Sequence, residues 1–155
     1  YFMIDKLERK QVGFNVLRGV EPFRYPNTAS DGRYVFLTNE QNGSDGEAFL
    51  MHVKARNLGT IVGVPSWGGL VGIINTQLTL DGGTVDQSNN GFYGREGKWW
   101  VENHGADPDL IVENDPASLM KGRDPQLEVG IATLLKQLKE NPTPAFPAVP
   151  AYPKR

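Results

Sequence analysis

The sequence contains no cysteine, which excludes disulfide bonds, thiolate nucleophiles and cysteine-ligated metals. It contains only two histidines, and neither lies close to another pair of candidate ligands, which argues against a zinc site. No apolar run approaches the roughly 20 residues that are needed to span a bilayer. The net charge of −2 provides no basic surface for a nucleic acid or an anionic membrane. We therefore expect neither a metal site nor a nucleic-acid or membrane partner.

The 155 residues, 39% apolar and 22% charged, fit one soluble globular domain. Residues 2–10 have the pattern of an amphipathic helix but no preceding cap, which predicts that this chain is a piece of a longer protein. Proline becomes dense after residue 141. We expect a folded core over residues 1–141, and over residues 142–155 a tail that is extended and weakly ordered or that straps a neighbouring subunit.

The most informative stretch is residues 39–50, which join an apolar strand over residues 34–38 to a helix over about residues 44–57. Ser44 lies in the polar turn between them, at the mouth of the helix. A serine at this position is commonly a helix N-cap. It can also be a nucleophile on a strand–turn–helix corner, beside free backbone N–H groups that can receive an oxyanion. The local pattern leaves both interpretations open.

A second apolar strand over residues 60–64 follows this helix, so the two strands should be parallel neighbours in an α/β sheet. Later apolar stretches predict a short strand over residues 12–17, a half-exposed strand over 73–80 with a hairpin turn after it, one or two strands over 85–100, and a last strand over 110–112. A helix should begin at Asp124-Pro125, end at Pro142, and pack on a sheet or helix through one apolar stripe: Leu127, Ile131, Leu134, Leu135 and Leu138.

The other candidate residues favour structural roles. Asp107 and Asp109 have no third ligand at a suitable spacing, so a turn is the better interpretation. Gly68-Gly69 leads into a strand, whereas a phosphate-binding loop leads into a helix. His52 lies about two turns along the Ser44 helix, too far to act as its base, and suits a core histidine. His104 lies two residues from Glu102 and remains a possible base. The residues alone leave the base for Ser44 unassigned.

Four motifs then occur in a specific order. They are Thr38-Asn39-Glu40-x-x-Gly43-Ser44-Asp45-Gly46-Glu47, Gly59-Thr60-x-Val62-Gly63-x-x-Ser66-Trp67-Gly68-Gly69-x-Val71-Gly72, Val101-Glu102-Asn103-x-Gly105-x-Asp107-Pro108-Asp109, and Gly122-Arg123-Asp124-Pro125-Gln126. This series closely resembles the C-terminal part of the tricorn protease core, a relative of the tail-specific serine proteases, over about residues 1–140. Four motifs in order are far more specific than any one of them.

The resemblance implies a Clp protease/crotonase-like fold, with a βαβ-built sheet and helices packed outside. Ser44 matches the nucleophile, the backbone N–H of Asp45 one half of the oxyanion hole, and Glu102 the acidic member of the catalytic group. The histidine and second serine that work with it, and the glycine that completes the oxyanion hole, correspond to positions before Tyr1. The resemblance also implies peptide substrates, no cofactor, a homo-oligomeric full-length protein, and a cytoplasmic location.

Two positions depart from the related patterns. Gly69 stands where tail-specific proteases carry the lysine of a Ser–Lys dyad, which favours the tricorn branch. Asn15 corresponds to the acidic residue with which tricorn selects basic side chains, and an amide provides no charge for that selection. We therefore expect the C-terminal part of a tricorn-like serine protease that is nearly inert as an isolated piece. The alternatives are a non-catalytic assembly module and, more remotely, a crotonase-like acyl-transfer enzyme.

Overall fold

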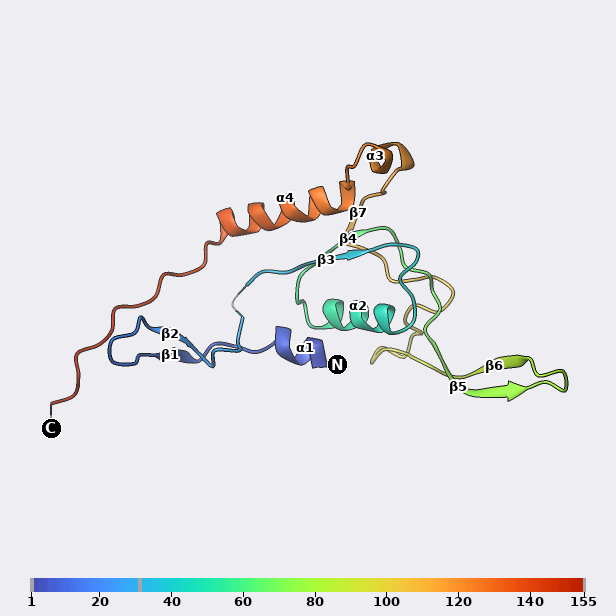
Figure 1. The fold of residues 1–155 in the computed structure, drawn as a ribbon, viewed down its shortest axis with the longest axis horizontal. Helices are drawn as coiled ribbons and strands as arrows, with labels where there is room; N and C mark the ends of the chain where they lie inside the picture. Colours follow the sequence, from blue (N-terminus) through green and yellow to red (C-terminus); the bar gives the residue numbers. More distant parts are fainter. Residues whose placement is uncertain (1, 31, 155) are drawn as a thin grey trace.

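A three-stranded parallel sheet lies at the centre of the computed structural model, which describes residues 2–30 and 32–154, without the side chains of Ile74 and Asn75. Its strands are β3 (Val35–Thr38), β4 (Thr60–Gly63) and β7 (Leu110–Ile111), in the spatial order β3–β4–β7. Helix α2 (Asp45–Ala55) connects β3 to β4 (Figure 1). The predicted βαβ unit and its parallel pairing are confirmed.

Helices cover both faces of this sheet (Figure 1). Because side chains alternate along a strand, neighbouring residues of β3 point to opposite layers. The ring of Phe36 contacts that of Phe49 on α2, with 5.6 Å between centroids. Val35 and Leu37 instead lie against α4 (Pro125–Glu140). The core on the α2 side includes α1 (Phe2–Leu7) and two loop segments that come from the site described below: Ile4, Leu50, Val53, Ile61, Leu70, Val101 and Ala106.

Helix α4 begins as predicted, with Asp124 as N-cap accepting the N–H of Leu127 and Pro125 as first helical residue. The prediction of its buried face was wrong. Gln126 and Gly130 are the buried residues of this helix, and Gly130 is where Val35 and Leu37 approach. A helix with a small residue on its inner face can lie close to a sheet. The close approach at Gly130, and not the leucine-rich stripe, therefore defines the buried face of α4. Four residues of the predicted stripe are exposed: Leu127, Ile131, Leu135 and Leu138.

Two hairpins extend from this body at opposite ends of the view in Figure 1. Strands β5 (Val71–Leu78) and β6 (Thr84–Gly91) form an antiparallel pair outside the central sheet. The prediction of a half-exposed strand over residues 73–80 was wrong. Every described side chain of this segment is exposed; those of Ile74 and Asn75 are outside the described side chains. The other hairpin pairs β1 (Gly13–Asn15) with β2 (Phe23–Tyr25), a strand that the sequence did not predict.

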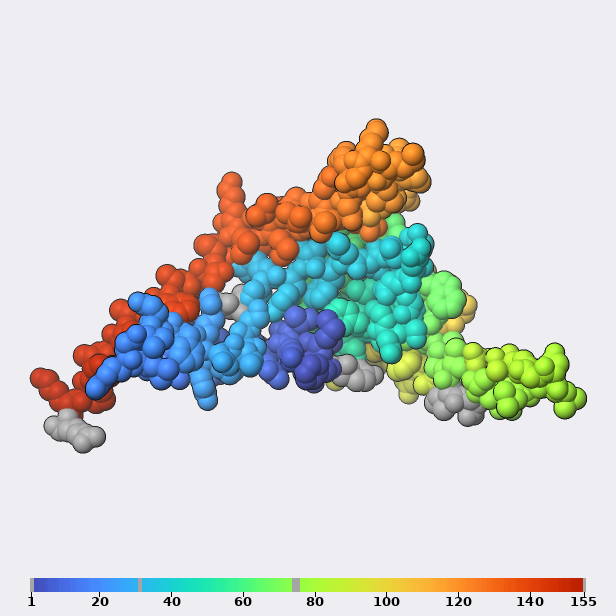
Figure 2. Space-filling view, viewed as in Figure 1, coloured from blue at the N-terminus to red at the C-terminus, as the bar shows by residue number. Residues whose placement is uncertain are grey.

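The proline-rich tail lies against the β1–β2 hairpin of the same chain (Figure 2). Phe14 contacts the ring of Phe146 with 4.8 Å between centroids, and the guanidinium of Arg24 lies 4.9 Å from that ring. Phe14 and Arg24 are directly paired across the hairpin. Arg33 donates to the carbonyl of Asn141 at the start of the tail. In the described chain, then, the tail is attached to its own β1–β2 hairpin through Phe146, and its start is held by Arg33.

One short helix, α3 (Pro116–Met120), was missed although Asp115-Pro116 repeats the start signal of α4. Asp115 accepts the N–H of Ser118 as a helix cap. Throughout residues 2–30 and 32–154, no helix has the length and apolar content needed to cross a bilayer.

Candidate active site

Ser44 lies at the corner where β3 gives way to α2, with an exposed side chain and a strained backbone. Its φ of 52° and ψ of −122° fall in a region that costs a non-glycine residue about 1–3 kcal/mol. An N-cap residue typically has extended backbone angles, as Asp115 and Asp124 do in this chain. Capping alone therefore does not require the conformation of Ser44. A sharp, strained strand-to-helix turn is the geometry that raises a nucleophilic serine above a sheet.

Asp45 is the first residue of α2, so its N–H points out of the helix end. Within the described part of the chain, no carbonyl or side chain accepts a hydrogen bond from this N–H. The following groups are occupied: Gly46 donates to the carbonyl of Gly43, and Glu47 to that of Ser44. A free donor at a positive helix end, next to an exposed hydroxyl, is suited to binding the oxygen of a tetrahedral intermediate.

Glu47 is a site residue that the sequence analysis missed. Its side chain is completely buried, and one oxygen, Oε2, accepts the N–H of Ser44 at 3.1 Å. The signal was present, because Ser44-x-x-Glu47 is the spacing of a capping box, in which the fourth residue reaches back to the first N–H.

The same carboxylate also binds the loop that follows β4. Gly68 and Gly69 donate their N–H groups to Glu47 at 2.5 and 2.9 Å, and the hydroxyl of Ser66 donates at 2.6 Å. The glycine pair thus receives an anion, as glycine-dense loops often do, but the anion is a side chain of the protein itself. Trp67 is exposed, and its indole lies across Gly43 and Gly69 beside the Ser44 turn.

The loop that contains Glu102 is also hydrogen-bonded to residues 66–69, the segment that binds Glu47. The carbonyl of Gly68 accepts the N–H of Asn103 at 2.8 Å, and Ser66 Oγ accepts the N–H of Ala106 at 2.7 Å. Gly68 has φ +86°, and a Cβ there would lie 2.8 Å from the N of His104. The structure therefore brings the turns of Ser44 and Glu102 to one edge of the sheet, linked through residues 66–69.

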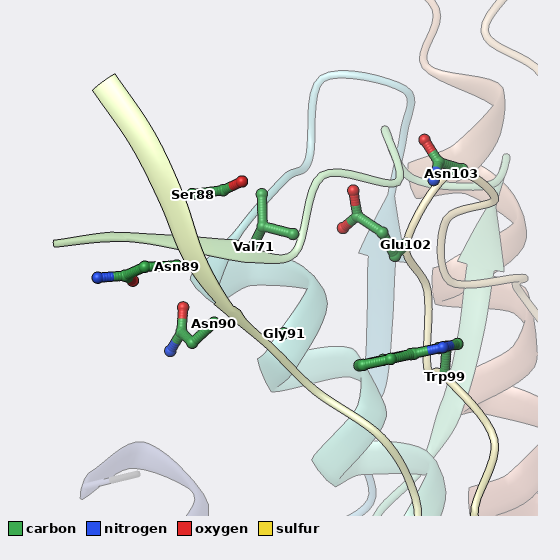
Figure 3. A pocket seen from close by; sticks show the side chains of 8 residues that line it. All are labelled: Val71, Ser88, Asn89, Asn90, Gly91, Trp99, Glu102 and Asn103. Atoms are coloured by element: carbon green, nitrogen blue, oxygen red, sulfur yellow. The ribbon is translucent and has the colours of Figure 1, made fainter. Parts of the chain in front are cut away.

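Glu102 points into an open cavity of about 550 Å³ (Figure 3). Its Oε2 is buried and has no hydrogen-bond partner among the described residues. A buried carboxylate oxygen without a donor is costly, so the arrangement of the described residues leaves this group incompletely satisfied. The cavity is lined by both strands of the β5–β6 hairpin and by the turn that precedes Glu102: Val71, Ser88, Asn89, Asn90, Gly91, Trp99, Glu102 and Asn103.

The two histidines contact other side chains of the described chain. His104, considered as a possible base, is exposed, and its Nε2 lies 3.0 Å from an oxygen of Asp107. His52 is half-buried and lies edge-on to Trp100, with 6.2 Å between ring centroids. Burial, together with the nearby charge of Arg56, lowers the pKa of His52 below its ordinary value of 6.5.

Asn15 is not brought to the site by this chain. It lies in β1, at the end of the view opposite to the hairpin that lines the Glu102 cavity (Figure 1). Its assignment as a specificity residue stays a prediction without support from this arrangement. The carboxylate of Asp109, considered above as a metal ligand, accepts the N–H of Ile61 in β4 at 2.7 Å, directly before the start of β7. Among residues 2–30 and 32–154, no cluster of three His, Asp or Glu side chains offers a metal site.

Comparison with known proteins provides independent evidence. The sequence profile of peptidase family S41 matches residues 5–112. The chain is 40% identical to tricorn protease homolog 1 of Streptomyces coelicolor over 96% of its own length and 14% of that protein. It is 35% identical to the tricorn protease of Thermoplasma acidophilum over 88% of its length and 13% of that protein. The chain therefore spans about a seventh of the curated relatives it matches.

The fold comparison agrees. A crystal structure of the tricorn protease superposes with a TM-score of 0.83 at 35% identity, covering 89% of this chain and 14% of that one. The expected Clp protease/crotonase-like α/β fold, with its sheet covered by helices, is thereby confirmed.

Proposed function

Because this chain belongs to peptidase family S41, we propose that it carries the nucleophile-bearing part of a tricorn-like serine protease. The observation that carries the proposal is the strained backbone of Ser44 at an exposed strand-to-helix corner, beside the free N–H of Asp45. In the proposed reaction, Ser44 Oγ attacks the carbonyl carbon of a peptide bond, and its proton passes to a general base. The tetrahedral intermediate collapses to an acyl-enzyme as the base returns its proton to the leaving amine, and water then hydrolyses the acyl-enzyme and frees the acid.

Asp45 N–H and the dipole of α2 stabilise the negative oxygen of this intermediate. The usual cost of losing one such donor is about 3 kcal/mol of barrier, so this N–H supplies a substantial share of the rate. No cofactor takes part in these steps.

Glu102 is proposed as the acidic member of the catalytic group, and its unpartnered oxygen supports this role. An acid that orients a base needs a hydrogen-bond donor, and the cavity in front of Glu102 has room for one. We propose that a histidine and a second serine from another part of the full-length protein occupy that space. The same proposal includes oligopeptide substrates, a homo-oligomeric assembly and a cytoplasmic location.

The test is hydrolysis of a set of fluorogenic peptides by the full-length protein and its Ser44→Ala variant. Loss of turnover by several orders of magnitude in the variant is expected, because the nucleophile of a serine triad contributes on the order of 10⁶ in rate. A fluorophosphonate probe should label the protein at Ser44 and should not label the variant. Undiminished turnover in Ser44→Ala, or a stable assembly that neither cleaves peptides nor reacts with the probe, would overturn the proposal.

A further inference from the structure

Glu47 is a fully buried ionisable side chain, and its four hydrogen-bond partners are all placed as donors. Each of its two oxygens receives two hydrogen bonds: Oε2 from the N–H groups of Ser44 and Gly69, and Oε1 from Gly68 N–H and Ser66 Oγ. No cation pairs with it among the described residues. Four hydrogen bonds on two oxygens match the acceptor capacity of a glutamate side chain.

These bonds connect the two segments that must stay in register in the proposed site. One donor is the peptide N–H of the nucleophile itself, whose backbone is held at a φ of 52°. The others belong to residues 66–69, which in turn bind the Glu102 turn through Asn103 and Ala106. A strained backbone conformation persists only where the surrounding structure holds it in place. Here the side chain of Glu47 bonds both the strained residue and the neighbouring 66–69 loop.

We propose that Glu47 is a positioning residue for the nucleophile. It holds Ser44 on the corner and fixes the distance between the Ser44 turn and the Glu102 turn, without touching the substrate. This inference rests on the proposed function, since it assigns Glu47 to the same reaction.

The side-chain chemistry specifies glutamate. Glutamine has the same length, but its amide nitrogen would face two N–H or O–H donors where Glu47 has an accepting oxygen. Aspartate is one methylene shorter, so we expect it to lose either the Ser44 N–H or the 66–69 loop.

The experiment compares Glu47→Gln and Glu47→Asp with Glu128→Gln in the full-length protein. Glu128 provides the matched control, because it is an exposed carboxylate of α4 that bonds Arg123. Glu47→Gln should lower kcat on the order of 10²-fold with little change in KM, as expected when a nucleophile is misplaced by about 1 Å. The rate of fluorophosphonate labelling should fall in parallel. Glu128→Gln should retain both rates.

A milder variant keeps the inference testable if Glu47→Gln does not fold. Ser66→Ala removes one of the four donors and should lower kcat less, again at unchanged KM. Rates are divided by the folded fraction from circular dichroism. The role of Glu47 would be overturned, and the proposed function left standing, if Ser44→Ala is inert while Glu47→Gln keeps full kcat. If Glu47→Gln does not fold, full kcat in Ser66→Ala has the same meaning. Retained turnover in Ser44→Ala would overturn both.

Discussion

Gly63 lies directly against the carbonyl oxygen of Thr38, where β3 and β4 end: a Cβ on Gly63 would be only 1.8 Å from that oxygen. Gly63 also has φ +139°, a conformation that other residues rarely adopt. The contact sets how closely the ends of the two strands approach, and the Ser44 turn begins at one of them. Glycine is therefore required here for both space and backbone angle.

We expect Gly63→Ala to destabilise the protein by about 3 kcal/mol or more, combining overpacking with backbone strain. Gly13→Ala is the matched control, since a Cβ on this strand residue meets no atom within 4 Å. Urea unfolding of both variants measures the difference. Equal midpoints would show that the close contact with Thr38 is not required.

Replacement of Ser44 should show the cost of its strained backbone as a difference in the free energy of unfolding. Glycine tolerates the backbone angles of Ser44, so Ser44→Gly should be more stable than Ser44→Ala by about 1 kcal/mol, although neither retains the hydroxyl.

Ser88, in strand β6, is the control for this comparison. Glycine in a strand costs roughly 0.5–1 kcal/mol relative to alanine, so the order of the two variants should reverse there. The same order at both positions, measured by urea unfolding, would contradict a strained conformation at Ser44.

His52 should make stability depend on pH. Burial first and the charge of Arg56 second lower its pKa in the folded protein, so the folded state disfavours the protonated ring. The unfolded chain then binds more protons in the range below about pH 6.5, and stability should fall as the pH is lowered through that range.

Thermal unfolding at pH 7.5 and at lower pH measures this loss, and His52→Gln should lose less stability over the same interval. An unchanged pH dependence in that variant would assign the effect to other groups.

Removal of the Phe146 ring should release the tail from the β1–β2 hairpin. The ring contacts both Phe14 and the guanidinium of Arg24, and an aromatic pair contributes about 0.5–1.5 kcal/mol beyond its buried area. Phe146→Ala should accelerate proteolysis and hydrogen exchange after Asn141. Tyr152→Ala, which removes an exposed ring of the same tail, should not. Equal protection in the two variants would exclude the Phe14 contact as the anchor.

The sequence was sufficient where local signals and connection rules agree. The strands around α2, their parallel pairing and the Asp124 cap follow from short-range patterns. The inner face of α4 could not be predicted in this way. Periodicity identifies an apolar stripe on a helix but does not show whether a sheet will cover that stripe, and here the sheet packs against Gly130 instead.

In the candidate site, the turn of Ser44 was predictable but its backbone angles were not. Those angles separate a strained corner from an ordinary cap. The other three partners of Glu47, which are Ser66, Gly68 and Gly69, lie about twenty residues further along the chain, beyond the range of any capping motif. Only the tertiary structure shows that an anion and a glycine loop face each other.

The anchored tail has a consequence for distance. From Pro144 to Pro153, every third residue is proline, which matches the three residues per turn of a polyproline II helix. These ten residues would extend about 30 Å at about 3.1 Å per residue. A proline-rich segment of this kind is extended and semi-rigid, although it has no internal hydrogen bonds. We therefore expect the part of the tail beyond Phe146 to hold the basic residue Lys154 away from the hairpin.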